Sequence, residues 1–74
     1  MKTPDIDAIR AFLLVADLKS FTRAADITGT TQAAISLKIK RLEESLGRPL
    51  LERTPRRVTL SAHGAVFLPS ARRL

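Results

Sequence analysis

A glycine between two short apolar helices is the feature that most limits how this chain of 74 residues can fold. Residues 21–28 carry apolar side chains at helical spacing, and Gly29 then accepts a left-handed backbone at no steric cost. A second helical pattern opens at Thr31, and two short helices joined by a glycine-containing turn are typical of the helix-turn-helix. Ala25 supplies a small residue for the helix crossing, and Ile35 supplies an apolar anchor. A plain three-helix bundle fits this pattern as well, so both readings stay open here.

Helical periodicity predicts four helices, at about 5–18, 21–28, 31–46 and from Ser61 to the end of the chain. The residues expected to face inward are Ile6, Ile9, Phe12, Leu13 and Ala16 in the first helix, Phe21, Ala24, Ala25 and Ile27 in the second, and Ile35, Ile39, Leu42 and Leu46 in the third. Suitable N-caps precede each helix: Asp5 or Thr3, then Ser20, Thr31 and Ser61. Gly47 should end the third helix, and Pro69 should kink the last helix or stop it early.

Two short runs between the third and fourth helices predict a β-hairpin. Residues 50–53 and 57–60 flank a turn at 54–56 that contains Pro55. The expected fold is therefore mainly α: a winged helix-turn-helix made of a three-helix bundle and a two-stranded β wing, followed by the start of a linker helix. We expect one domain at 1–60, with the helix-turn-helix at about 21–40 and the wing at about 50–60. Residues 61–74 would begin a helix that continues in a longer protein.

The positive charge of the chain is confined to its second part. Residues 1–31 hold four basic and four acidic residues, whereas residues 32–74 hold nine basic and three acidic residues, which accounts for the net charge of +6. Such asymmetry favours a polyanionic partner, either nucleic acid or a membrane surface, although ordinary surface charge is the alternative. The chain has no cysteine, which excludes disulfides and thiolate metal sites, and no long apolar run or secretion signal, so we expect a cytoplasmic protein.

The outward face of the third helix indicates what the polyanion is. With its apolar stripe in the core, a rotation of about 100° per residue turns Ala33, Ser36, Leu37, Lys40 and Glu44 outward, with Gln32 and Arg41 on the flanks. Its first two turns carry no acidic residue, as a recognition helix entering the major groove requires. Gln32 can pair with an adenine edge, Ser36 can bond a base or phosphate, and Leu37 can contact a thymine methyl. An isolated surface leucine is the plainer reading of Leu37.

Basic side chains around this face are expected to hold the DNA backbone. The residues assigned to phosphates are Thr31, Lys38, Lys40 and Arg41 on the helix, and Arg53, Arg56 and Arg57 on the wing. Three arginines around a tight turn favour an anionic partner in the backbone or a narrow minor groove, although a solvated loop is possible. Glu43 and Glu44 lie beyond the groove-facing part, and we expect them to form ion pairs along the helix, such as Lys40 with Glu44.

Other functional classes fit the sequence less well. The single histidine, His63, stands beside Ser61 at a helix start, where a serine is better explained as a cap than as a nucleophile. No carboxylate pair, phosphate loop or ligand cluster is present in the sequence, so we expect no enzyme, no cofactor and no metal. A protein-interaction winged helix without DNA binding is the main alternative. A membrane-surface helix is a weaker one, because no predicted helix joins a strongly basic face to a large apolar face.

The stretch from Ser20 to Thr54 resembles the LysR-type transcriptional regulators. The matching residues are Ser20-Phe21-Thr22-Arg23-Ala24-Ala25, Thr31-Gln32, Arg41-Leu42-Glu43-Glu44, Leu46-Gly47, Pro49-Leu50 and Glu52-Arg53, then Leu60-Ser61, Gly64 and Ala71-Arg72. The resemblance implies an N-terminal DNA-binding head, a dimerising linker helix and a separate C-terminal domain that binds a small-molecule effector. It implies that the partners are double-stranded DNA and a second copy of the protein, with Phe67, Leu68 and Leu74 as candidate dimer contacts.

The resemblance also implies which residues meet DNA. Positions matching Gln32, Ala33, Ser36, Leu37 and Arg53 commonly do so in the family. Ala33 stands where proline is frequent, and Leu37 stands where a polar or basic residue is frequent. The base preference of this chain is therefore expected to differ from that of its relatives.

Overall fold

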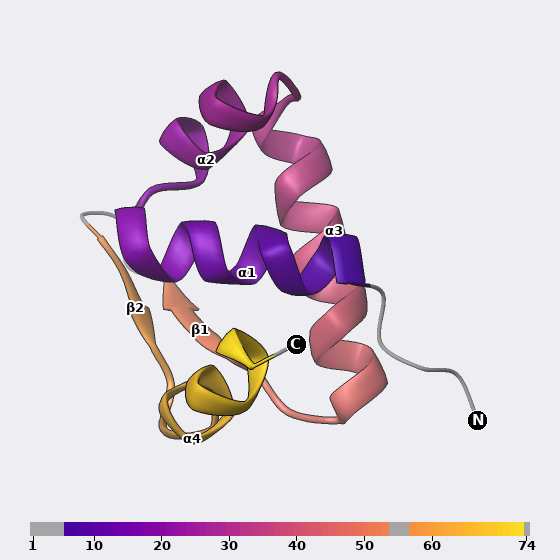
Figure 1. Cartoon of the computed structure of the whole chain (residues 1–74), viewed down its shortest axis with the longest axis vertical. Helices are drawn as coiled ribbons and strands as arrows, with labels where there is room; N and C mark the ends of the chain where they lie inside the picture. The colour runs from indigo at the N-terminus through magenta and orange to yellow at the C-terminus, as the bar shows by residue number, and fades with distance from the viewer. Residues whose placement is uncertain (1–5, 54–56, 74) are drawn as a thin grey trace.

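The computed structural model describes residues 6–53 and 57–73, which form a mainly helical fold with a two-stranded wing (Figure 1). The elements in order are α1 (Ile6–Leu18), α2 (Phe21–Thr28), α3 (Gln32–Leu46), β1 (Leu51–Arg53), β2 (Val58–Leu60) and α4 (Ala62–Arg72). The strands pair antiparallel, with Leu51 opposite Leu60 and Arg53 opposite Val58. The predicted winged helix-turn-helix is confirmed. The predicted turn at 54–56 lies outside the described residues.

Side-chain caps and left-handed glycines define the helix ends, as the sequence predicted. Ser20, Thr31 and Ser61 each accept a hydrogen bond from the backbone N–H three residues later, at 3.0–3.1 Å. Gly29 (φ 70°) and Gly47 (φ 71°) end α2 and α3 in the left-handed conformation, which places the third helix directly after a tight turn. The expected cap of α1, Asp5 or Thr3, lies outside the described residues.

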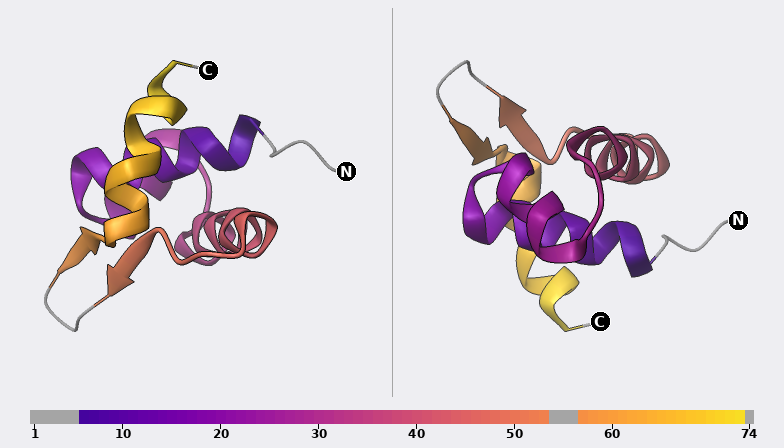
Figure 2. Two further views of the ribbon diagram at one scale, coloured as in Figure 1. Left: turned by 90° about the horizontal axis from the view of Figure 1, so that it is seen from below. Right: turned by 90° about the horizontal axis from the view of Figure 1, so that it is seen from above.

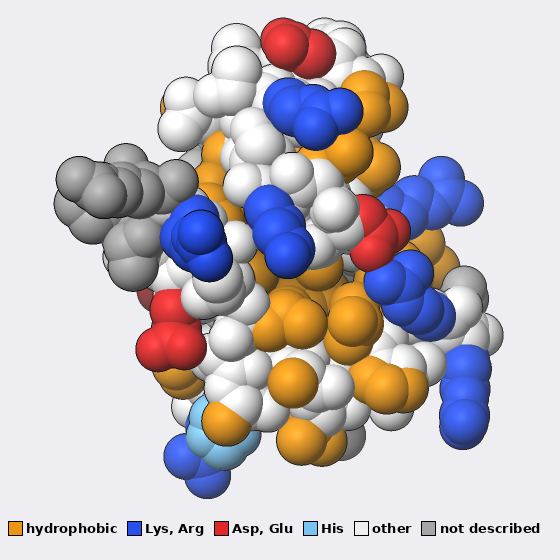
Figure 3. All heavy atoms as spheres, turned by 90° about the vertical axis from the view of Figure 1, so that its left-hand side faces the viewer, with side chains coloured by type: hydrophobic (Ala, Val, Ile, Leu, Met, Phe, Trp, Pro, Cys, Tyr) orange, Lys and Arg blue, Asp and Glu red, His pale blue; other side chains and the backbone are white. Residues whose placement is uncertain are grey.

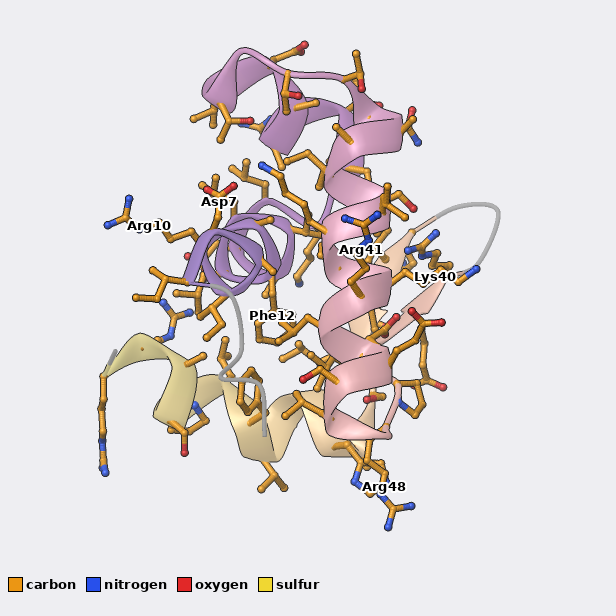
Figure 4. All side chains as sticks on the ribbon, turned by 90° about the vertical axis from the view of Figure 1, so that its right-hand side faces the viewer. Asp7, Arg10, Phe12, Lys40, Arg41 and Arg48 are labelled. Atoms are coloured by element: carbon orange, nitrogen blue, oxygen red, sulfur yellow. The ribbon has the colours of Figure 1, made fainter. Side chains whose placement is uncertain are left out.

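The core lies where α1, α3 and α4 meet around Phe12. The Phe12 side chain is fully buried, lies in the space between these helices and has its ring centroid 5.7 Å from that of Phe67 in α4 (Figure 4). The buried apolar residues of the described chain are Ala8, Ile9, Ala11, Phe12, Val15, Phe21, Ala24, Ala25, Ile35, Ile39, Leu42, Leu50, Leu51 and Ala71. Because Ala71 and Phe67 pack into this core, α4 contributes to the stability of the head.

Two residues expected to face inward are exposed instead. Ile6 and Ile27 are each 62% exposed, so their assignment to the core was wrong. In α1 the buried stripe runs through Ala8, Ala11 and Val15, and Ile6 lies on the opposite side of the helix. In α2 the buried residues Phe21, Ala24 and Ala25 define a stripe that Ile27 does not join. Helical position, rather than side-chain size, separates Ile6 and Ile27 from the core, since the large side chains of Ile9 and Phe21 are buried in the same two helices.

The fourth helix packs closely on the loop before the wing. A Cβ added at Gly64 would lie 2.0 Å from the Leu50 carbonyl oxygen, so only glycine permits this approach. Ser61 strengthens the same junction, because its hydroxyl donates to the Pro49 carbonyl oxygen at 2.6 Å. The helix continues through Pro69 to Arg72, whose guanidinium bonds Asp17 of α1 at 2.6 Å. Of the two outcomes predicted at Pro69, a kink or an early stop, the early stop was wrong, because α4 packs against α1 beyond the proline.

The wing projects from the body beside α3, which the two axial views show nearly end-on (Figure 2). This arrangement places the end of β1 next to the N-terminal half of the third helix. The face that carries β2 and the end of α1 is different: Lys and Arg side chains are scattered over it among acidic ones, and apolar side chains gather in its lower half (Figure 3). The fold thus brings the end of β1 and α3 together, as the hydrogen bond between Arg53 and Ser36 shows.

Candidate nucleic-acid interface

The outward side of α3 presents the side chains that the sequence assigned to DNA. Gln32 and Ala33 are exposed at the first turn, Ser36 is half-buried, and Leu37 is 48% exposed. Lys40 and Arg41 are exposed one turn later, where they extend from the outward side of the helix (Figure 4). The helix carries no acidic residue before Glu43, so this face combines neutral side chains at its start with positive charge behind them.

Thr31 and Lys38 have partners within the protein that distinguish them from Lys40 and Arg41. The Thr31 hydroxyl oxygen accepts from the Ala34 N–H and so serves the helix cap. The Lys38 ammonium bonds a carboxylate oxygen of Asp7 in α1 at 2.6 Å. This hydrogen bond and the positive charge of Lys38 lower the pKa of Asp7 below its ordinary value. Lys38 is thereby tied to α1, and an acidic partner already lies beside its charge.

Arg53, at the end of β1, joins the wing to both helices of the helix-turn-helix. Its guanidinium donates from Nη1 to the Ser36 hydroxyl oxygen at 3.0 Å. The guanidinium carbon also lies 4.3 Å from the ring centroid of Phe21, the first residue of α2. The structure therefore joins two predicted DNA contacts, Ser36 and Arg53, by a direct hydrogen bond, and it places Arg53 over a phenylalanine that the sequence assigned only to the core.

The other wing arginines are described less completely. Arg57 is exposed directly before β2, and Arg56 lies outside the described residues together with Thr54 and Pro55. Arg57 has an interaction of its own with the rest of the chain. Arg53 is thus the wing arginine whose surroundings the structure defines.

Glu43 has a role that the sequence did not predict. Its Oε2 atom accepts from the backbone N–H groups of Leu50 at 2.7 Å and Leu51 at 3.2 Å. The expected ion pair between Lys40 and Glu44 is not among the two ion pairs that residues 6–53 and 57–73 form, so that prediction was wrong. A sequence signal existed: Gly47 and Pro49 turn the chain sharply back, which leaves the following N–H groups in need of an acceptor near the helix end. Glu43 therefore fixes the root of the wing against α3.

The described residues show no other kind of site. Among them, no three His, Asp or Glu side chains gather closely enough to hold a metal ion. No helix in the described part of the chain is long and apolar enough to cross a membrane. His63 is exposed in the first turn of α4, away from the junction of α3 and the wing.

Comparison with known proteins decides the family. The sequence profile described as "Bacterial regulatory helix-turn-helix protein, lysR family" matches residues 6–65. The chain belongs to the LysR family. It is 44% identical over 70 residues to the SDS degradation transcriptional activation protein of Pseudomonas sp. (strain ATCC 19151), covering 95% of this chain and 23% of the relative. It is 41% identical over 70 residues to the uncharacterized HTH-type transcriptional regulator YbhD of Escherichia coli (strain K12), covering 95% and 22%.

Solved structures of LysR-family proteins share the fold. The BenM_DBD/catB site 1 DNA complex superposes with a TM-score of 0.88 at 38% identity, covering 93% of this chain and 78% of that one. Vibrio fischeri DarR in complex with DNA gives a TM-score of 0.90 at 32% identity, covering 97% and 24%. The chain is therefore a LysR-type DNA-binding domain of a transcription regulator. It spans 22–24% of the length of four curated relatives that it matches.

Proposed function

We propose that this domain reads a specific sequence of double-stranded DNA with α3 in the major groove and the wing on the backbone or in the adjacent minor groove. The observation that carries the proposal is the junction of Ser36 and Arg53, which sets the wing beside the acid-free start of α3. A helix needs this combination of small, neutral and basic side chains to lie between phosphates and reach base edges. Solved structures of similar domains in complex with DNA support duplex DNA as the ligand.

The proposed roles divide by position on α3 and the wing. Base edges would be read by Gln32, Ala33, Ser36 and Leu37. The backbone would be held by Thr31, Lys38, Lys40, Arg41, Arg53, Arg56 and Arg57. We expect Lys40 and Arg41 to contribute more than Lys38, because Asp7 already offsets the Lys38 charge. The apolar pair Ala33 and Leu37 favours contact with thymine methyl groups over hydrogen bonding to bases.

We propose further that residues 1–60 act as the reading head and that 61–74 begin a linker helix through which the full protein forms a homodimer or a higher oligomer. Val66 of α4 is 78% exposed and borders a shallow apolar groove lined partly by Leu46, Leu50 and Phe67, which would suit a second copy. Phe67 and Leu68 are half-buried within the head, and Leu74 lies outside the described residues. Substituting Val66→Glu should lower the dimer fraction of the full-length regulator in analytical ultracentrifugation, whereas Arg73→Glu should not.

The remaining proposals concern the whole protein. A separate C-terminal domain would bind the small-molecule effector, and the regulator would act in the bacterial cytoplasm, where the chromosome lies. The protein would work by binding rather than by catalysis, as expected from relatives that are transcriptional regulators. No cofactor or membrane enters this mechanism.

The salt dependence of duplex binding tests the proposed DNA contact. Counterion release predicts that affinity falls with a log–log slope of about −0.9 per phosphate contact. We expect fluorescence anisotropy on a duplex selected from a random pool to show such a slope, and Lys40→Gln to reduce it by about one contact. Arg73→Gln, at the exposed end of α4, is the control and should leave it unchanged. A flat salt response, or no preference for duplex DNA, would refute the proposal and favour a protein-interaction winged helix.

A further inference from the structure

The contact between Arg53 and Ser36 changes what each group can offer to a ligand. Because the Ser36 hydroxyl oxygen accepts from Arg53, its own proton points away from the guanidinium. A guanidinium has donors only, and Arg53 keeps further N–H groups beyond the one that bonds Ser36. Within residues 6–53 and 57–73, the ion pairs are Lys38–Asp7 and Arg72–Asp17, so Arg53 carries its charge without an acidic partner there. The pair therefore presents hydrogen-bond donors and one uncompensated positive charge.

Phe21 holds this donor pair in place. Its ring lies 4.3 Å below the guanidinium carbon, and the residue itself is only 7% exposed because it packs into the core. A flexible arginine is thus supported on a fixed aromatic face, from one side, and oriented by a hydroxyl on the neighbouring helix. Such support removes part of the conformational freedom that the side chain would otherwise lose on binding.

We infer that Ser36 and Arg53, oriented by Phe21, form one composite site at the junction of α3 and β1 that binds a single acceptor oxygen of a DNA phosphate. The inference rests on the proposed function and makes it more specific, because it assigns Ser36 to the backbone together with Arg53 rather than to a base. A phosphate oxygen fits better than a purine nitrogen because the site carries a full positive charge and donors alone. Phe21 acts as a positioning residue through Arg53.

A double-mutant cycle tests whether Ser36 and Arg53 bind the same phosphate oxygen. It measures the affinity of each variant for the duplex selected from the random pool. Ser36→Ala and Arg53→Lys should each weaken binding about tenfold, since a hydrogen bond to a charged group is lost or misplaced. The double variant should also weaken binding about tenfold rather than about a hundredfold, because both changes disable the same contact. Ser45→Ala, an exposed serine further along α3, is the matched control and should have no effect. Independent, multiplying effects would overturn the composite site.

Modified duplexes identify the acceptor. Replacing single phosphates by uncharged methylphosphonates should reveal one position at which wild type, Ser36→Ala and Arg53→Lys bind alike. If 7-deazapurine substitution, and no methylphosphonate, abolishes the Ser36→Ala effect, the acceptor is a base nitrogen and the phosphate assignment is wrong. If the wild-type protein shows no duplex preference at all, the proposed function fails rather than the composite site alone.

Comparing substitutions of Phe21 and Phe12 separates the positioning role of Phe21 from its role in core packing. Phe21→Leu should lower DNA affinity about two- to fivefold, the value of a partly exposed cation–π contact, and should have no further effect in an Arg53→Ala background. Phe12→Leu removes a ring of the same core that has no contact with Arg53, so it should reduce thermal stability without lowering the affinity of the folded protein. Equal losses of affinity in both variants would show that Phe21 only packs.

Discussion

The two sides of α3 differ sharply in burial and in charge. Ile35, Ile39 and Leu42 are at most 2% exposed on one side, whereas Leu37 on the other is 48% exposed among neutral and basic neighbours. The buried side is fixed by the need to cover Phe12 and the rest of the core. The outward side has no such demand, so its composition is free to serve the proposed contact with DNA. In the proposed function, one helix thus carries the stability of the head on one face and its ligand preference on the other.

Charge follows the same division. Lys38, at the border between the two sides, is paired with Asp7 of α1. Lys40 and Arg41 have no ion-pair partner among the residues that the structure describes. The protein therefore offsets a lysine that lies against its own body and leaves the charges on the outward side available to phosphates.

Substituting neighbouring apolar residues on the two sides should give the largest contrast. Ile39→Ala removes a fully buried side chain, and we expect it to cost about 2–5 kcal/mol of unfolding free energy, enough to unfold much of so small a domain. Leu37→Ala should change stability by only about 0.5 kcal/mol, while weakening DNA binding. Urea titration followed by circular dichroism measures the first effect, and anisotropy measures the second. Comparable losses of stability in both variants would contradict the division.

Local sequence signals were enough to predict most of the fold. The caps at Ser20, Thr31 and Ser61 and the glycines at 29 and 47 act within a few residues of themselves, so element boundaries could be read directly from the chain. The apolar stripe of α3 was equally clear. The same reasoning failed for Ile6 and Ile27, which are apolar but lie outside the buried stripes of their helices.

The site could be predicted only as far as single residues and their chemistry. The exposure of Gln32, Ala33 and Leu37 follows from the helical period, whereas their DNA contacts remain predictions. The pairing of Arg53 with Phe21, 32 residues earlier in the chain, depends on how the wing folds back. Lys38 with Asp7 is likewise a contact between elements that are distant in the chain. Such partners need the tertiary structure, since no local pattern brings them together.

Glu43 belongs to α3, but its carboxylate supports the start of the wing. Glu43→Ala should cost about 1.5–3 kcal/mol of stability, because the N–H groups of Leu50 and Leu51 lose a charged acceptor. Glu44→Ala, the exposed neighbour, should change stability little and is the matched control. Thermal unfolding compares the two, and amide hydrogen exchange at Leu50 and Leu51 should quicken only in the first. Unchanged exchange at these amides would show that the carboxylate does not support the wing.

Gln32→Ala should change DNA binding without changing stability, because Gln32 lies on the outward side of α3. We expect a loss of about 1–3 kcal/mol in binding free energy that is confined to one base pair, because a bidentate contact to an adenine edge would be lost. Competition among duplexes that differ at single positions measures this selectivity. Stability should not change, since the side chain is exposed. A uniform loss across all duplexes would assign Gln32 to the backbone instead.

Asp7→Asn should give the smallest effect, and it tests where the border between the two sides lies. The hydrogen bond and charge of Lys38 lower the pKa of Asp7 below 3.8, so the ion pair contributes stability above that pH and loses it as the pH falls through the lowered pKa. Wild type should therefore be slightly more stable than Asp7→Asn at pH 7, with the difference vanishing in acid. Urea titrations at pH 7 and in acid measure this difference in stability, with Asp26→Asn as the control.

The same variant should act in the opposite direction on DNA. Without Asp7 beside it, the Lys38 charge becomes available, so Asp7→Asn should bind duplexes more tightly at low salt and show a steeper salt dependence than wild type. Lys38→Gln should cancel this gain when added to Asp7→Asn, which assigns the effect to the lysine. If Asp7→Asn leaves the salt slope unchanged, Lys38 belongs to the structural side of α3 and its proposed phosphate contact is wrong.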